Sequence, residues 1–269
     1  MCTTEAAAAT YNILTFGAKP DAAVDATQPF LQAWASAFQI DGTLVAPSDY
    51  RDIGNSGYWI LFIHVNRISV IGGTLDANGA GFWACKKSGQ NCPVGDKSIT
   101  FNWANDVLIS GLTTLNSQLM HVVINSCNNV LVRNVRIVAP DLSPNTDGIH
   151  VQSSTGVTIT GSSIKTGDDC ISTSPGTRNL WMEKIHIGSL GRDFNEAGVE
   201  NVTLTASIFS GSNNGLWVKT WARPSNGFVR NIYYRNILMK NVDDPTIIDQ
   251  NYCPDKIERL RINLLSIYI

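Results

Sequence analysis

The chain has 269 residues, of which 43% are hydrophobic and 16% charged, and its 20 basic and 22 acidic residues give a formal net charge of -2. This near-balance, without any basic run, argues against a nucleic-acid-binding surface. No apolar run approaches the ~20 residues that a membrane-spanning helix needs, and the first residues lack the charged-then-apolar layout of a secretion signal. We therefore expect one soluble body that contacts neither nucleic acid nor membrane.

The first predicted element is a helix over residues 27–38, TQPFLQAWASAF, where apolar residues recur at helical spacing after a Thr cap. A helix in this place can cover the open end of a solenoid, whose first coil would otherwise expose a strand edge. We therefore assign residues 11–40 to an N-terminal cap region.

From residue 66 onward one pattern recurs, an asparagine or glycine followed by alternating apolar residues. Its first apolar positions are Ile68, Val107, Val130, Val157, Leu180, Val202 and Ile232, so that every step after the first is 22 to 30 residues. This step is too short for βαβ units of about 30 or more residues, but it fits one coil of short strands. We predict an all-β, right-handed parallel β-helix that forms a single domain over residues 1–269, with residues 255–269 as an atypical tail.

A β-sandwich or a propeller is the rival fold, since its short strands would also alternate. A sandwich needs hairpin turns, which Asn-Gly or Asp-Gly between two strands would indicate. Here Asp147-Gly148 and Asn214-Gly215 open strands near the same point of the repeat. That placement favours coils over hairpins.

The six cysteines form neither a dense disulfide scaffold nor a zinc pattern. Cys85 and Cys92 would close a short loop, so we predict a disulfide between them. Cys127 lies in an apolar run and is predicted to be a buried thiol, because cysteine packs as a small hydrophobe. The sequon Asn201-Val202-Thr203 is a weak hint of secretion.

Acidic residues recur at the interval of the repeat. Asp147, in SPNTDGIH, and Asp168, in TGDDC, are 21 residues apart, so they would lie on successive coils separated by ~4.8 Å. Lys219 follows about two coils later and shares their face. Like charges held together raise one another's pKa and leave one acid protonated. The alternative is that these acids only cap turns of the solenoid.

Such a cluster suits glycoside hydrolysis, in which one carboxylic acid protonates the leaving oxygen and a carboxylate activates water or attacks carbon. Asp168 and Asp169 are neighbours, so both can face one substrate only where the strand bends, which Gly167 would permit.

The blocks SPNTDGIH, TGDDC, IGSLG and VKTWARPSNG resemble the signature blocks of plant polygalacturonases, pectin-cleaving glycoside hydrolases with a parallel β-helix fold. The resemblance runs from YNILTFGAKPD to IIDQNYCP and covers nearly the whole chain. It implies that Asp168 is the general acid, that Asp147 and Asp169 hold and activate the attacking water, and that Lys219 binds substrate. It also implies inversion without a metal or organic cofactor, a monomer acting on pectic polysaccharide, and secretion to the cell wall.

The chain departs from that family at several points. The family's Cys-Gly-Pro-Gly-His-Gly run is missing after Ile185, which removes a histidine of the catalytic site and the partner of Cys170; His186 lies in a different register. Trp217 stands where the family has an arginine that grips the substrate carboxylate. The early coils are also shorter near residues 38–41. These gaps predict weak binding and slow turnover.

Two other functions fit part of the pattern. A catalytically silent wall-polysaccharide binder would keep the groove and Lys219, and an exposed Trp217 could stack on a sugar ring. A calcium-dependent pectate lyase would need several oxygen ligands for its cation and a basic residue for proton abstraction, whereas the acids here match the hydrolase blocks.

Overall fold

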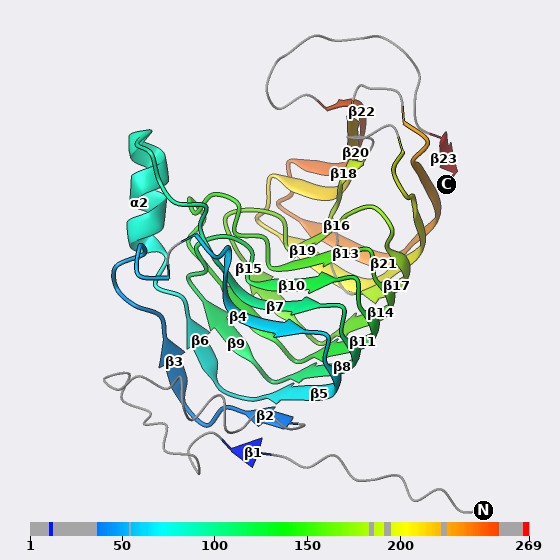
Figure 1. Ribbon diagram of the computed structural model, residues 1–269. Helices are drawn as coiled ribbons and strands as arrows, with labels where there is room; N and C mark the ends of the chain where they lie inside the picture. The colour runs from blue at the N-terminus through cyan, green and yellow to red at the C-terminus, as the bar shows by residue number, and fades with distance from the viewer. Residues whose placement is uncertain are drawn as a thin grey trace, which may run out of the picture.

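The computed structural model of the protein describes residues 11–12, 37–53, 55–182, 186–190, 195–221, 225–252 and 266–268. In this part of the chain, short parallel strands wind into a solenoid with three sheets (Figure 1). The predicted parallel β-helix is therefore confirmed.

The ten-stranded sheet contains the predicted repeat. In order its strands are β1 (Tyr11–Asn12), β2 (Ala37–Gln39), β5 (Asn66–Ile71), β8 (Asn105–Ser110), β11 (Asn128–Arg133), β14 (Thr155–Thr160), β17 (Arg178–Met182), β19 (Val199–Ser210), β21 (Phe228–Lys240) and β23 (Ser266–Tyr268). The first apolar positions of the repeat, from Ile68 to Ile232, are register partners on successive strands.

The two other sheets complete the coils. The eight-stranded sheet has the order β22 (Asp244–Tyr252), β20 (Asn214–Trp221), β18 (His186–Leu190), β16 (Ile171–Thr173), β13 (Ile149–Gln152), β10 (Val122–Asn125), β7 (Lys97–Asn102) and β4 (Tyr58–Ile63). The five-stranded sheet has the order β15 (Ser163–Lys165), β12 (Arg136–Val138), β9 (Thr113–Leu115), β6 (Thr74–Asp76) and β3 (Thr43–Val45).

Each coil from β2 to β16 passes through the ten-, five- and eight-stranded sheets in turn. The next coil is shorter: β17 ends at Met182 and β18 begins at His186. Among the described residues, no strand of the five-stranded sheet follows β15. Strand β15 is therefore the last strand of the five-stranded sheet in the described part of the chain.

Alternation along each strand builds the core. In β8, Val107 and Ile109 are fully or almost fully buried, and their register partners above and below are also apolar. Each such side chain stabilises the fold by roughly 1.5–3 kcal/mol through burial. At the eight-stranded sheet, the rings of Phe62 and Phe101 stack with centroids 5.0 Å apart.

The asparagines of the repeat have a conformational role. Asn129, Asn179, Asn201 and Asn231 all have positive φ near 55°, a left-handed conformation that asparagine tolerates better than most residues. The Nδ2 atom of Asn201 donates to Asn179 Oδ1 at 3.0 Å, and its Oδ1 accepts from Asn231 at 2.9 Å. The sequon asparagine is thus engaged on both sides in a ladder between coils.

The ends of the chain differ from the sequence prediction. Residues 27–36 of the expected helix lie outside the described part, but Ala37 and Phe38 belong to strand β2, which pairs with β5. Phe38 is buried and meets Phe62 edge-on, so packing in the core overrides the helical spacing. Within the predicted atypical tail, residues 266–268 form β23, a parallel partner of β21.

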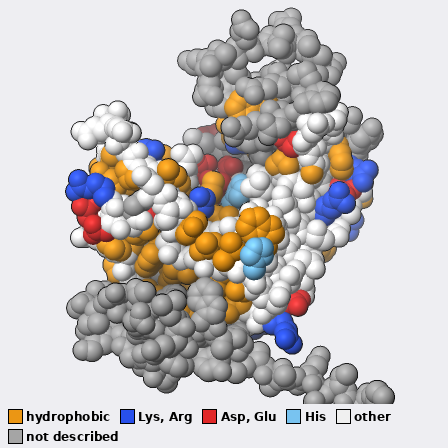
Figure 2. Space-filling view, viewed as in Figure 1, with side chains coloured by type: hydrophobic (Ala, Val, Ile, Leu, Met, Phe, Trp, Pro, Cys, Tyr) orange, Lys and Arg blue, Asp and Glu red, His pale blue; other side chains and the backbone are white. Residues whose placement is uncertain are grey.

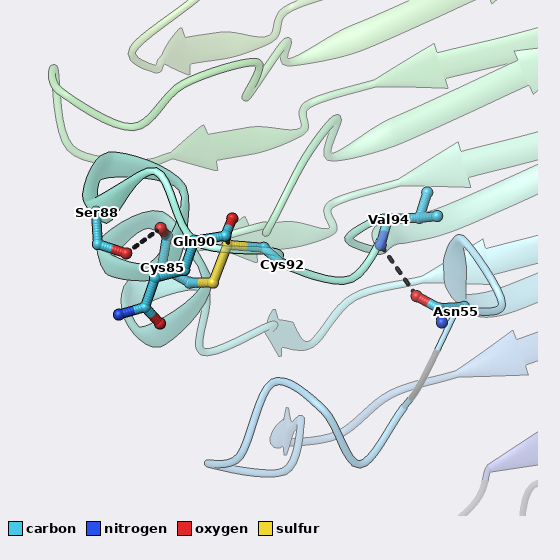
Figure 3. Close-up of a disulfide and its surroundings, with 6 residues drawn as sticks. All are labelled: Asn55, Cys85, Ser88, Gln90, Cys92 and Val94. Atoms are coloured by element: carbon cyan, nitrogen blue, oxygen red, sulfur yellow. Dashed lines mark hydrogen bonds between the residues drawn. A yellow bond between two sulfur atoms is a disulfide. The ribbon is translucent and has the colours of Figure 1, made fainter.

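Helix α2 (Ala80–Ser88) was not predicted. It lies beside the solenoid after β6 and buries Phe82 and Cys85 (Figure 1). The predicted disulfide between Cys85 and Cys92 is confirmed, with Cα atoms 6.0 Å apart, and it ties the end of α2 to the following segment (Figure 3). Cys127 is a buried thiol, as predicted.

Candidate active site

The acidic residues lie in the turns that lead into the eight-stranded sheet. Asp147 precedes β13, and Asp168 and Asp169 precede β16. Ile149 pairs with Ile171, and Gly148 N donates to Asp169 O at 2.9 Å. Asp147 and Asp169 are therefore register equivalents on adjacent coils, whereas the sequence spacing had suggested Asp147 and Asp168.

Two glycines allow these turns to approach closely. A Cβ atom at Gly167 would lie 2.3 Å from Ser143 O and 2.8 Å from Pro140 O, and one at Gly148 would lie 2.5 Å from Cys170 O. Real Cβ atoms essentially never come so close to backbone oxygens. The bend that brings Asp168 and Asp169 to one place therefore needs glycine at position 167, as the sequence suggested.

The surroundings of Asp147 change its pKa strongly. Asp147 is 8% exposed, and Ser172 Oγ donates to its Oδ2 at 2.5 Å. Burial, followed by the negative charge of Asp169, raises its pKa to about 7; the hydrogen bond from Ser172 opposes this shift, and the charge of Asp168 adds to it. Asp147 thus retains a proton under mildly acidic conditions.

Asp168 and Asp169 have different surroundings. Asp168 is exposed, and its two carboxylate oxygens accept hydrogen bonds from the backbone N–H groups of Asn145 and Asp169, at 3.2 and 2.8 Å. Asp169 is 8% exposed, and its Oδ2 lies 3.8 Å from Lys219 Nζ. One carboxylate therefore faces outward and the other is buried against a cation.

Lys219 reaches this cluster from β20, two strands beyond β16 in the eight-stranded sheet. Its Nζ lies 4.5 Å from the ring centroid of Trp217 and 5.1 Å from that of Tyr252. The ammonium group is therefore held between two aromatic rings as well as beside Asp169. Figure 2 shows acidic side chains gathered in a hollow of this face of the molecule.

Comparison with known proteins identifies the family. A model described as glycosyl hydrolases family 28 matches residues 20–264. The chain belongs to glycosyl hydrolase family 28.

This family 28 chain is similar to curated plant proteins. A polygalacturonase from Prunus persica is 47% identical over 91% of this chain and 73% of its own length. An exopolygalacturonase from Platanus acerifolia is 39% identical over 81% of this chain and 60% of its own length. The crystal structure of a hyperthermoactive exopolygalacturonase from Thermotoga maritima shares the fold, with a TM-score of 0.76 at 18% identity over 97% of this chain and 80% of that one.

Sequence reasoning missed two residues beside the acids of this family 28 chain, Ser172, which contacts Asp147, and His150, which contacts Ser172. His150 Nδ1 lies 2.7 Å from Ser172 Oγ, the hydroxyl that donates to Asp147. Loss of hydration lowers the pKa of His150 to about 4, so the ring is neutral near pH 7. A signal was present, because His150 and Ser172 each follow an acid by three positions, in DGIH and DCIS.

The histidine run that the resemblance implies would fall in the short coil. Strand pairing places His186 in register with Ser172, the residue that donates to Asp147; the side chain of His186 lies outside the described part. Cys170, for which the resemblance implied a disulfide partner, carries a thiol whose Sγ donates to Ile164 O at 3.8 Å.

Within the described ranges, no group of three or more His, Cys, Asp or Glu residues is arranged to hold a metal ion. In the same part of the chain, no helix has the length and apolar character needed to cross a membrane.

Proposed function

We propose that this family 28 hydrolase cleaves the α-1,4-galacturonosyl links of polygalacturonate, the backbone of pectin, with inversion. The observation that carries the proposal is the carboxyl cluster of Asp147, Asp168 and Asp169 on adjacent coils, with Lys219 beside it. Two similar plant proteins are a polygalacturonase and an exopolygalacturonase. Acid–base hydrolysis of a glycosidic bond needs this combination of protonated and ionised carboxyl groups.

In the proposed reaction Asp168 protonates the leaving glycosidic oxygen, while Asp147 and Asp169 hold and activate the attacking water. The exposure of Asp168 supports its role, because the general acid must reach the substrate. The ion pair with Lys219 supports an ionised Asp169, since only a carboxylate makes that interaction. The raised pKa of Asp147 means that the cluster retains a proton as the pH approaches 7.

Substrate positioning is the weaker part of this site. Lys219 supplies one point charge for the galacturonate carboxylate, and that charge is shared with Asp169. Trp217 packs under the ammonium group and has no guanidinium fork for bidentate binding. We therefore propose that the chain binds polygalacturonate weakly and turns it over slowly.

We also propose that the protein is a secreted monomer of the cell wall that acts without a metal or organic cofactor. The Cys85–Cys92 disulfide supports secretion, because disulfides persist in oxidising compartments.

Release of reducing ends from polygalacturonate, with and without a chelator, tests the proposed function. We expect reducing ends in both conditions, no unsaturated products, and a loss of at least about 100-fold in Asp168→Asn. Unsaturated products that disappear with chelator would instead identify a lyase.

A silent binder is the second candidate, favoured by the Lys219–Trp217 contact, which provides a charge and an aromatic ring in one place. It predicts that polygalacturonate binds and that this binding is lost in Lys219→Ala, while no reducing ends form. Asp168→Asn should then bind as well as the unaltered chain.

A further inference from the structure

A chain of side-chain hydrogen bonds leads away from the buried carboxyl group of the site. Asp147 Oδ2 accepts from Ser172 Oγ at 2.5 Å, and Ser172 Oγ lies 2.7 Å from His150 Nδ1. Asp147 is 8% exposed and His150 is half-buried. The hydrogen bonds thus lead from the interior of the site to a partly exposed ring.

The serine hydroxyl has one hydrogen, and this fixes the direction of each hydrogen bond. When Asp147 is ionised, Ser172 donates to it, and the serine oxygen accepts from a proton on His150 Nδ1. When Asp147 is protonated, its O–H donates to Ser172, which then donates to an unprotonated Nδ1. The proton of the neutral ring must in that case be on Nε2. The protonation of Asp147 and the tautomer of His150 are therefore coupled through Ser172.

A proton can also move along these hydrogen bonds from solvent to Asp147, and no charge remains on the ring or the hydroxyl. Nε2 of His150 takes a proton from solvent, Nδ1 gives its proton to Ser172 Oγ, and Ser172 gives its own hydrogen to Asp147 Oδ2. The imidazole ring and the hydroxyl are neutral before and after, and the net change is one proton added to Asp147.

We propose that Ser172 and His150 are positioning residues that fix the side chain of Asp147 and relay protons between its carboxyl group and the surface. The purpose of this relay rests on the proposed hydrolase function, because the acids of a hydrolase must return to their starting protonation after each turnover. The relay itself is a property of the hydrogen-bonded chain and can be observed without substrate.

Several charged groups face this chain from neighbouring elements. Asp168 and Asp169 act on Asp147 from the turn before β16. Asp169 also acts on His150, as does Lys97 at the start of β7. Lys219 on β20 is paired with Asp169. The ring of His121, just before β10, is neutral, because burial lowers its pKa to about 3, and it is bonded to Thr114. A variant of any of the charged groups would shift the pH at which the tautomer changes, whereas loss of Ser172 would uncouple Asp147 from His150.

Nitrogen-15 NMR of the histidine rings in the full chain tests the relay. The His150 signals are assigned by their loss in His150→Asn, whose amide can still donate from a position near Nδ1. Between pH 5 and pH 9 we expect the two ring nitrogens of His150 to exchange their protonated and unprotonated chemical shifts. Asp147→Asn and Ser172→Ala should each abolish this exchange, and Ser172→Thr, which keeps the hydroxyl, should retain it.

The outcomes separate the relay from the proposed reaction. One unchanged His150 tautomer from pH 5 to pH 9 in the unaltered chain would overturn the relay, as would an exchange that persists in Ser172→Ala. If Ser172→Ala does not fold, the unaltered chain and Asp147→Asn still decide. Absence of reducing-end release with an intact tautomer change would contradict only the hydrolase function. In an active chain, Ser172→Ala should shift the acidic limb of the kcat/KM profile to higher pH, because the lost hydrogen bond stabilised ionised Asp147.

Discussion

At the scale of single residues, three aspartates with identical side chains differ in exposure and in their hydrogen-bond partners. Asp168 is exposed and accepts two backbone hydrogen bonds, Asp169 is buried against Lys219, and Asp147 is buried with a hydroxyl as its donor. Burial and the charges of Asp169 and Asp168 raise the pKa of Asp147 to about 7, whereas Asp169, which is equally buried, has Lys219 beside it. The three carboxyl groups are therefore not equivalent, as the distinct parts proposed for them require.

Asp147→Asn should make the stability of the fold less dependent on pH. The pKa of Asp147 is raised from 3.8 to about 7 in the folded chain, so the native state binds more protons than the unfolded state between these values. The free energy of unfolding therefore falls as the pH rises from about 4 to about 7. The asparagine variant avoids this loss, which is on the order of 4 kcal/mol. Urea unfolding at pH 4 and pH 8 measures the effect.

Asp141→Asn is the matched control, since this exposed aspartate lies in the same turn and pairs loosely with Lys165 at 3.9 Å. It should leave the pH dependence unchanged. An Asp147→Asn variant that is no more stable than the unaltered chain at pH 8 would contradict the buried, proton-retaining state of Asp147.

The sequence predicted part of this residue-level arrangement. The spacing of Asp147 and Asp168 placed them correctly on adjacent coils. The register equivalent of Asp147 is nevertheless Asp169, because strand pairing depends on the length of each turn, which the number of residues between two acids does not reveal. The link through Ser172 and His150 was missed, since a serine and a histidine within strands carry little chemical signal until the strands are paired.

At the scale of elements, the turns before β13 and β16 position the chemistry. Gly167→Ala should disrupt the bend that carries Asp168 and Asp169, because the new Cβ would lie 2.3 Å from Ser143 O. We expect a destabilisation of roughly 2–4 kcal/mol and a fall in turnover larger than the stability loss explains. Thermal unfolding and reducing-end assays on the same preparations measure both effects.

Gly89→Ala is the control for this substitution. Gly89 has positive φ of 70° but open space around its Cβ position, so alanine there costs about 1–2 kcal/mol for its backbone conformation. Its turnover should be unchanged. If Gly167→Ala behaves like this control, the close approach of the two turns is not what aligns the acids.

The Cys85–Cys92 disulfide ties the end of α2 to the segment before β7. The double variant Cys85→Ala/Cys92→Ala should lower the free energy of unfolding by about 2–3 kcal/mol, as the closure of a short loop predicts. Thermal unfolding with and without reductant measures this. The unaltered chain should respond to reductant, and the double variant should not. Equal responses would show that the bond contributes nothing to stability.

Elements in which apolar residues recur at a regular spacing were predicted well, and the other elements were predicted poorly. The repeat of the ten-stranded sheet was found because alternating apolar residues recur from coil to coil after an asparagine or glycine, and at Asn129, Asn179, Asn201 and Asn231 this asparagine is left-handed. The predicted helix is wrong at Ala37 and Phe38, which pair with β5. A short apolar run fits both the helical and the strand period, and the sequence does not show which residues it packs against. Helix α2 was missed because its nine residues include Gly81, a poor helix former, and show no strong apolar stripe.

At the scale of the whole molecule, the short coil between β17 and β18 lies where the resemblance implies a further histidine-containing segment. Insertion of a Cys-Gly-Pro-Gly-His-Gly segment after Ile185, combined with Trp217→Arg, should raise turnover by about 100-fold or more, because orientation of the substrate then improves. Reducing-end release measures the change. A Gly-Ser insertion of the same length, also combined with Trp217→Arg, is the control. Equal turnover in the inserted and unaltered chains would mean that the gap is harmless.

The end of the five-stranded sheet at β15 has a consequence for motion near the site. Strand β12 is bonded on both sides, by β9 and β15, whereas β12 is the one partner of β15 among the described strands. Edge strands with fewer neighbours open locally at lower free energy. Backbone amides of residues 163–169 should therefore exchange with deuterium faster than those of β12. A bound oligosaccharide that contacts Asp168 and Lys219 should slow that exchange, in which case the opening of this rim, and not the unfolding of the solenoid, would limit how long the acids stay aligned.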